Sequence, residues 1–185
     1  MESTYRLLDN QIKAHLKGVN TYETIEYNLN LSQILDQYDI SEDAKLACLT
    51  IDTAMRHLDS ITNRNLSRNA ILVGDLLSAH FYTLLAELNE PEYQQQISTA
   101  IVRINELKSA IHHDTLSNEE LAKAILTIET AFPSITLSYF ASNVDLEELN
   151  NKILNNLKDN CPSYLLKFKH EELNSILEDI ETRHI

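Results

Sequence analysis

The chain has 185 residues, enough to bury a core as one domain, and its 43% hydrophobic and 23% charged residues are typical of a folded protein. Fifteen lysines and arginines against 28 aspartates and glutamates give a formal net charge of −13, which disfavours nucleic acid and anionic membrane surfaces as partners. Only two glycines and three prolines are present, so the turn residues that a sheet protein needs are scarce and an all-α helical bundle is expected.

No targeting or membrane-spanning segment is predicted. Residues 1–18 contain acidic side chains and lack an apolar signal core, and the uncharged run 130–144 is too short, too polar and interrupted by proline to span a bilayer. Cys48 and Cys161 lie far apart, outside any metal-binding spacing, and Cys48 falls on an apolar helix face. This favours a buried free thiol in a reducing compartment, so we expect a cytoplasmic protein.

The first predicted elements lie between residues 22 and 69. Residues 22–38 form a weakly amphipathic opening, and Ser41 then predicts an N-cap, with Glu42 and Asp43 favourably placed in the first helical turn. Apolar residues recur at a spacing of three and four along the helix that follows, which predicts one buried face. These residues are Ala44, Ala47, Cys48, Ile51, Ala54, Met55 and Leu58. Residues 60–69, SITNRNLSRN, predict a polar connection.

The next helix, predicted at 70–88, is apolar on nearly every side. At roughly 100° per residue, one side carries Val73, Leu77, Phe81, Leu84 and Leu88, a second Ile71, Tyr82 and Leu85, and a third Leu72, Leu76 and Ala79. His80, Thr83 and Glu87 form a narrow polar strip. A helix of this kind is buried nearly all round, either as the central helix of its own chain or as an interface helix, and the pattern leaves both possibilities open.

The remaining elements become more polar toward the C-terminus. A helix at 94–111 carries one apolar stripe; Ser117 and Glu120 then predict a capping box, and Pro133 predicts the end of that helix. Two polar-rich amphipathic helices follow within 145–185. We therefore expect a single helical domain over 1–185, with its core at about 41–132.

Motifs of catalytic chemistry are scarce. The sequence has no glycine-rich phosphate loop, no G-x-S-x-G and no cysteine–histidine pair of catalytic spacing. The segment His112-His113-Asp114 falls at a helix end, where favourable charge at the C-terminus explains it better than a metal site does.

Three stretches together resemble the small, non-catalytic subunit (component 1) of bacterial heterodimeric hexaprenyl and heptaprenyl diphosphate synthases. They are TIDTAMRHLDSITN (50–63), LVGDLLSAHFYTLLAEL (72–88) and IVRINELKS (101–109), and they occur in the order typical of that family. The resemblance implies a shortened isoprenoid-synthase fold. It also implies a subunit that is not catalytic by itself, is required for the activity of a large subunit and helps to set the length of the product.

In the catalytic relatives, a D-D-x-x-D segment binds the magnesium that holds the allylic diphosphate. The matching residues here are Asp59, Ser60, Ile61, Thr62 and Asn63, so one of three carboxylates remains, which is a poor cage for a metal–diphosphate cluster. The paired arginines and glycine that follow in those relatives are absent, as is a second aspartate-rich segment. The resemblance thus implies no catalytic residue, no metal ligand and no cofactor on this chain, with Mg²⁺ expected on the catalytic partner.

The resemblance also implies that the helices at 71–88 and 94–111 pair with the large catalytic subunit, as a heterodimer or a dimer of heterodimers. Some of their side chains would also contact the growing prenyl chain. The expected interface and chain-length residues are Leu72, Val73, Leu76, Leu77, His80, Phe81, Leu84, Leu88, Ile101 and Ile104. Family membership further implies menaquinone biosynthesis, since such products usually become quinone side chains.

Two alternatives remain at this point. One is a stand-alone enzyme that binds a metal–diphosphate through Asp52, Asp59 and Asp75, of which the first two lie two turns apart on one helix face. The other is a homodimeric helical interaction module without a role in prenyl transfer.

Overall fold

The computed structural model describes residues 2–17, 23–64, 67–157 and 160–183; within these ranges the side chains of 62–64, 179 and 181–183 are not described. The described residues form eight α-helices, one short 3-10 helix (η1) and no strand, which confirms the all-α fold class. In chain order the elements are α1 (Thr4–His15), α2 (Leu29–Leu35), α3 (Glu42–Arg64), α4 (Arg68–Leu88), α5 (Pro91–His112), α6 (Asn118–Phe140), α7 (Leu146–Leu157), η1 (Ser163–Leu165) and α8 (His170–Arg183).

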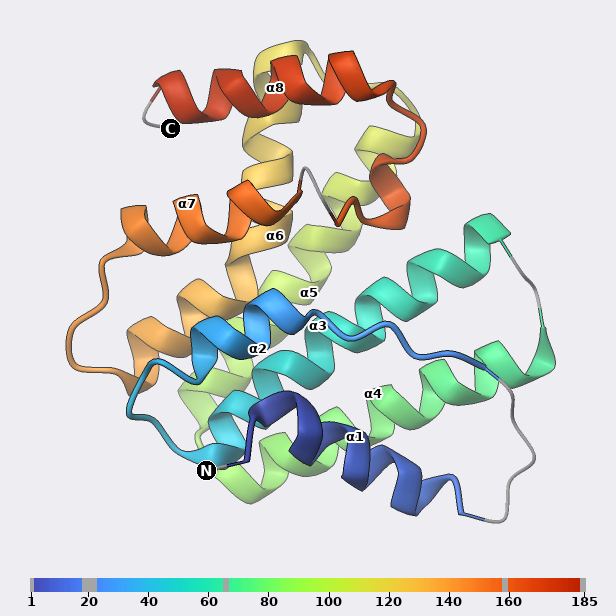
Figure 1. Ribbon diagram of the computed structural model, residues 1–185, viewed down its shortest axis with the longest axis vertical. Coiled ribbons are helices and arrows are strands. Elements are labelled where there is room, and N and C mark those ends of the chain that lie inside the picture. The colour runs from blue at the N-terminus through green and yellow to red at the C-terminus, as the bar shows by residue number, and fades with distance from the viewer. Residues whose placement is uncertain (1, 18–22, 65–66, 158–159, 184–185) are drawn as a thin grey trace.

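The helices are arranged around two of their number, α3 and α6, which pack against each other. α4 runs antiparallel to α3 along most of its length, and α1 packs on α3 as well (Figure 1). α5, α7 and α8 pack on α6, with α7 and α8 (orange and red) crossing it at one end of the molecule (Figure 1). α2 lies over the junction and contacts α1, α3, α6 and α7.

The predicted helix starts are confirmed by their hydrogen bonds. The Ser41 Oγ accepts from the backbone N–H of Ala44 at 3.3 Å. At the start of α6, the Ser117 Oγ accepts from the Glu120 N–H at 3.4 Å, and the Glu120 carboxylate accepts from the Ser117 N–H at 2.8 Å, which completes the capping box. These contacts satisfy N–H groups that have no partner within the helix.

The N-terminal third differs from the sequence prediction. Within 22–38 only Leu29–Leu35 is helical, and α1, which was not predicted, precedes it. The start of α1 is stabilised by groups from the region of α2. Thr4 donates to Asp36 from its backbone N–H (3.3 Å) and its hydroxyl (2.5 Å), and the Tyr5 N–H donates to the Ser32 Oγ at 2.9 Å. The N-cap residue Ser3 makes no side-chain capping bond, so these distant residues stabilise the helix start in its place.

Two predicted boundaries were wrong. The polar connection at 60–69 is shorter than expected, because α3 continues to Arg64 and buries Ile61, while α4 begins at Arg68 with Ser67 as its N-cap. Pro133 does not end its helix: α6 continues to Phe140. Proline removes one helical N–H and costs about 3 kcal/mol. Here the turn around it is buried in the core with Phe132 and Leu137, and that burial outweighs the cost.

Cys48 is fully buried on the core side of α3, as predicted, and burial raises the pKa of its thiol to about 12. Cys161 is half-buried. We expect a maleimide to label Cys48 in the native chain at least about 1,000-fold more slowly than an exposed thiol, because only the thiolate reacts. Cys161 should be labelled first, and both thiols should react in denaturant. Rapid labelling of both cysteines in the native chain, followed by mass spectrometry, would contradict the buried position of Cys48.

Candidate functional site

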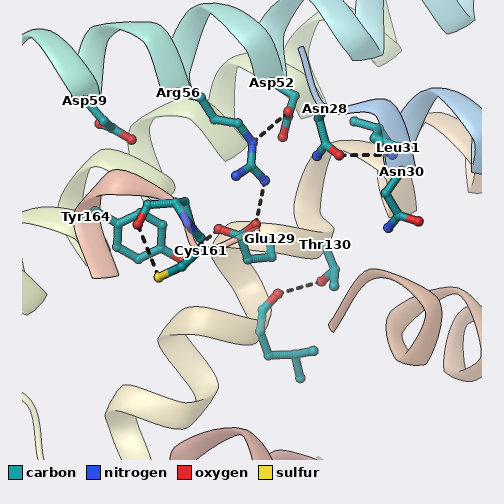
Figure 2. A network of polar contacts seen from close by, with 12 residues as sticks. Asn28, Asn30, Leu31, Asp52, Arg56, Asp59, Glu129, Thr130, Cys161 and Tyr164 are labelled. Atoms are coloured by element: carbon teal, nitrogen blue, oxygen red, sulfur yellow. Dashed lines mark hydrogen bonds and ion pairs between the residues drawn. The ribbon is translucent and has the colours of Figure 1, made fainter. Parts of the chain in front are cut away.

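Asp52, Arg56 and Asp59 belong to a centre where α3, α5, α6 and η1 meet (Figure 2). The helical repeat places Asp52, Arg56 and Asp59 on one side of α3. Arg56 donates from Nε to the Asp52 carboxylate at 2.8 Å and from Nη2 to Glu129 of α6 at 2.6 Å. Only 2% of the Glu129 side chain is exposed, so this ion pair lies inside the protein.

Tyr164 of η1 completes the hydrogen bonding of Glu129. Its hydroxyl donates to the second carboxylate oxygen of Glu129 at 2.8 Å. Burial and the nearby Glu129 carboxylate raise the pKa of Tyr164 well above its ordinary value, so the phenol remains a neutral donor. Burial lowers the pKa of Arg56, but Asp52 and Glu129 outweigh that effect and hold it above its ordinary value. The buried carboxylate is thus matched by one cation and one neutral donor.

Asp59, the one carboxylate left in the aspartate-rich segment, is paired with a lysine of α5. The Lys108 Nζ donates to Asp59 at 2.5 Å, and the two side chains are 12% and 21% exposed, respectively. Burial raises the pKa of Asp59, and Lys108 opposes that rise. The Lys108 ammonium also lies 5.4 Å from the centroid of the Tyr164 ring, within the range of a cation–π contact.

These contacts leave the segment poorly suited to a magnesium–diphosphate cluster. Asp52 and Asp59 are each neutralised by a side-chain cation, and Asp75 is exposed on α4 instead of facing them. The Ser60 hydroxyl donates to the His57 carbonyl at 2.7 Å; the Asn63 side chain lies outside the described residues. Among the described residues, no three His, Cys, Asp or Glu side chains form a metal-binding group.

A cavity of about 820 Å³ adjoins this centre. Its walls are formed by segment 23–31, by α3 with Arg56, by Glu129 of α6, by α7 and by residues 160–163. Its lining is rich in amide side chains, including Asn28 and Asn30, which face the same region (Figure 2). Both amides already have partners: Asn28 caps α2 by accepting from the Leu31 N–H, and Asn30 donates to the Lys152 carbonyl.

α4 has one buried side and one exposed side, so it is not buried all round within this chain. The buried side contacts α3 and the core, and Gly74 lies so close to α3 that an added Cβ would come within 2.7 Å of the Leu58 side chain. The exposed side carries large apolar groups: Ile71 is 45% exposed, Leu72 46% and Tyr82 60%. Ala79, Thr83 and Ala86 lie between them on the same side, together with the exposed carboxylate of Asp75.

The predicted interface residues differ widely in how much surface they expose. Five of the ten predicted side chains have essentially no surface to offer a second chain: Val73, Leu77, Phe81, Leu84 and Ile104. They pack in the core of this chain, so truncating Phe81 would act on its folding first and on assembly only indirectly. The most apolar side of α4 faces inward because burying it there completes the core.

The other half of the set does reach the surface. Leu72 is exposed, and Leu76, His80, Leu88 and Ile101 are partly exposed. His80 also contacts α1, where its Nε2 lies 2.8 Å from the Gln11 Oε1, and burial together with the charge of His15 lowers its pKa. The sequence-based set omitted Tyr82 and Val102, which are 60% and 59% exposed.

The sequence analysis also missed most of the buried centre. The spacing of Asp52 and Arg56, one helical turn apart, is the one local signal that was available for it. Nothing in the sequence joins Arg56 to Glu129 or Glu129 to Tyr164, because these residues come from separate elements.

Of the described helices, α4 alone is long and apolar enough to cross a membrane by length and composition. A helix packed in the core of a bundle meets the same criteria, and the inner side of α4 is packed in this way.

The chain matches both a family model and a solved structure. The family model described as hexaprenyl diphosphate synthase, small subunit (HexPS-like) matches residues 2–135. A crystal structure of heptaprenyl diphosphate synthase from Staphylococcus aureus is similar along the whole chain. It shares 46% sequence identity with a TM-score of 0.90, and the alignment covers 99% of this chain and 100% of the other.

Proposed function

Because this chain belongs to the family of hexaprenyl diphosphate synthase small subunits, we propose that it is the non-catalytic subunit that a separate catalytic chain needs for long-chain prenyl transfer. A small subunit implies a large catalytic partner. The docking part of this proposal rests on the exposed, mostly apolar side of α4. We call this side the α4 face; it comprises Ile71, Leu72, Leu76, Ala79, Tyr82, Thr83 and Ala86.

The α4 face is the kind of surface that a stable partner covers. Ile71, Leu72 and Tyr82 place three large, half-exposed apolar side chains on one helix, and small residues between them allow a second helix to approach closely. Val102 and Ile101 of α5 add further apolar surface. An obligate interface should bury on the order of 2,000 Å² or more, so the partner would extend beyond α4.

The buried centre supports a role without catalysis. Transfer of a prenyl group needs cations that neutralise the departing diphosphate. In this chain the carboxylates of Asp52 and Asp59 are already neutralised by Arg56 and Lys108, respectively. We therefore propose that Mg²⁺ and the catalytic carboxylates belong to the partner, and that this chain completes the partner's fold from outside its active site.

The same docking would bring side chains of this subunit close to the growing prenyl chain. Leu72 and Leu76 of the α4 face, together with Leu88 at the C-terminal end of α4, would help to limit the length of the growing chain from the neighbouring subunit. We place the pair in the cytoplasm, as a heterodimer or a dimer of heterodimers that supplies the prenyl side chain for menaquinone.

The test is incorporation of labelled isopentenyl diphosphate into farnesyl diphosphate with Mg²⁺. It is run on this chain, on its cognate catalytic chain and on the mixture. We expect long products from the mixture alone. Activity in this chain alone would restore the stand-alone enzyme alternative. A catalytic chain that is fully active by itself, with unchanged products on mixing, would remove the subunit role. In that case, a discrete homodimer in sedimentation would favour the interaction module.

A further inference from the structure

The C-terminal half of α5 packs on α6 but reaches α3 mainly through one lysine side chain. The backbone of α5 packs closely on α6, whereas its packing against α3 is sparse. Lys108 crosses the gap between α5 and α3 to reach Asp59, and its ammonium lies over the Tyr164 ring. A charged contact between largely buried side chains therefore connects α5 to α3 on this side.

A second lysine reaches the end of α5 from the segment between α7 and α8. The Lys167 Nζ donates to the Ile111 carbonyl at 2.6 Å and to the Asp114 carboxylate at 2.5 Å. Ile111 lies in the last turn of α5, where carbonyls lack helical donors and the helix dipole favours a cation. Asp114, at φ 55°, turns the chain out of the helix, and its N–H also donates to Ile111.

One short segment takes part in the contacts of both lysines. Tyr164 and Lys167 lie within residues 161–168, and η1 in this segment packs on α3. The same segment therefore contacts α3 through η1, α6 through the Tyr164–Glu129 hydrogen bond, and the end of α5 through Lys167. It connects three helices at the point where α5 stands away from α3.

We propose that residues 161–168 act as a clamp that fixes the C-terminal half of α5 relative to α3 and thereby sets the position of Val102, at the start of that half, for the catalytic partner. The clamp itself rests on the contacts above, and its effect on docking rests on the proposed function. Without the clamp, α5 would keep its contacts with α6, but its last turns would open more often.

The proposal is tested first on the isolated chain by hydrogen exchange. In Lys167→Met, the amides of the last two turns of α5 should exchange about 10-fold faster or more, while those of α4 keep the wild-type rate. Lys167→Arg should retain most of the protection, because a guanidinium still donates to a carbonyl and a carboxylate. Lys123→Met is the matched control, since Lys123 pairs with Glu119 of its own helix and is exposed.

The second measurement is binding of the same variants to the catalytic chain. We expect Lys167→Met to lower the affinity about 10-fold, with Lys123→Met at the wild-type value. Unchanged exchange in α5 would overturn the clamp, and faster exchange with wild-type affinity would overturn its role in docking. A wild-type chain that binds no catalytic chain would refute the proposed function instead, and the exchange result would still decide whether the clamp exists.

Discussion

Replacing Thr83 by arginine should lower the affinity for the catalytic chain by about 100-fold or more and remove prenyl transfer from the mixture at concentrations that saturate the wild type. Thr83 lies on the α4 face, and its hydroxyl makes only a hydrogen bond to the Ala79 carbonyl of its own helix at 3.1 Å. Arginine at this position would force a bulky charged side chain into the covered interface, and pairing with Glu87 one helical turn away would not remove the cost of burying it. Such burial costs about 3 kcal/mol or more, which corresponds to that loss of affinity.

The chain offers a closely matched control for this substitution. Thr127 is an exposed residue of α6, and its hydroxyl donates to the Lys123 carbonyl at 2.9 Å. Thr127→Arg therefore makes the same chemical change on a helix surface outside the proposed interface. Both variants should melt within a few degrees of the wild type, because neither side chain is buried. Wild-type affinity in Thr83→Arg, measured by titration calorimetry, would show that the partner does not cover the α4 face.

Replacing Arg56 by methionine should destabilise the chain by about 3–5 kcal/mol, because it leaves the buried carboxylates of Asp52 and Glu129 without their cation. For a chain of this size, that loss lowers the melting temperature by roughly 10 °C. Thermal unfolding followed by circular dichroism measures it. The double variant Arg56→Met/Glu129→Gln should recover part of the loss, because the amide removes the more deeply buried of the two stranded charges.

Local patterns predicted most of the helices from Ser41 onward. The caps at Ser41 and Ser117 and the apolar repeats of α3 and α5 each lie within a few residues, so their physics can be read from a short window. Pro133 shows the limit of such reading, since tertiary burial of the surrounding turn outweighs a local helix-breaking preference. α1 shows the converse, because its start is stabilised by residues of another element.

The sequence by itself determined the all-α class, most helix positions, the loss of two carboxylates from the aspartate-rich segment and the resemblance to a small prenyl synthase subunit. Tertiary packing determines which side of α4 stays exposed, since the sequence of a helix that is apolar nearly all round does not indicate which side packs in the core. It also decided the partners of the charged groups. Arg56 meets Glu129 73 residues away, and Asp59 meets Lys108 49 residues away. Such pairs form only when packing brings separate helices together, because no short-range spacing encodes them.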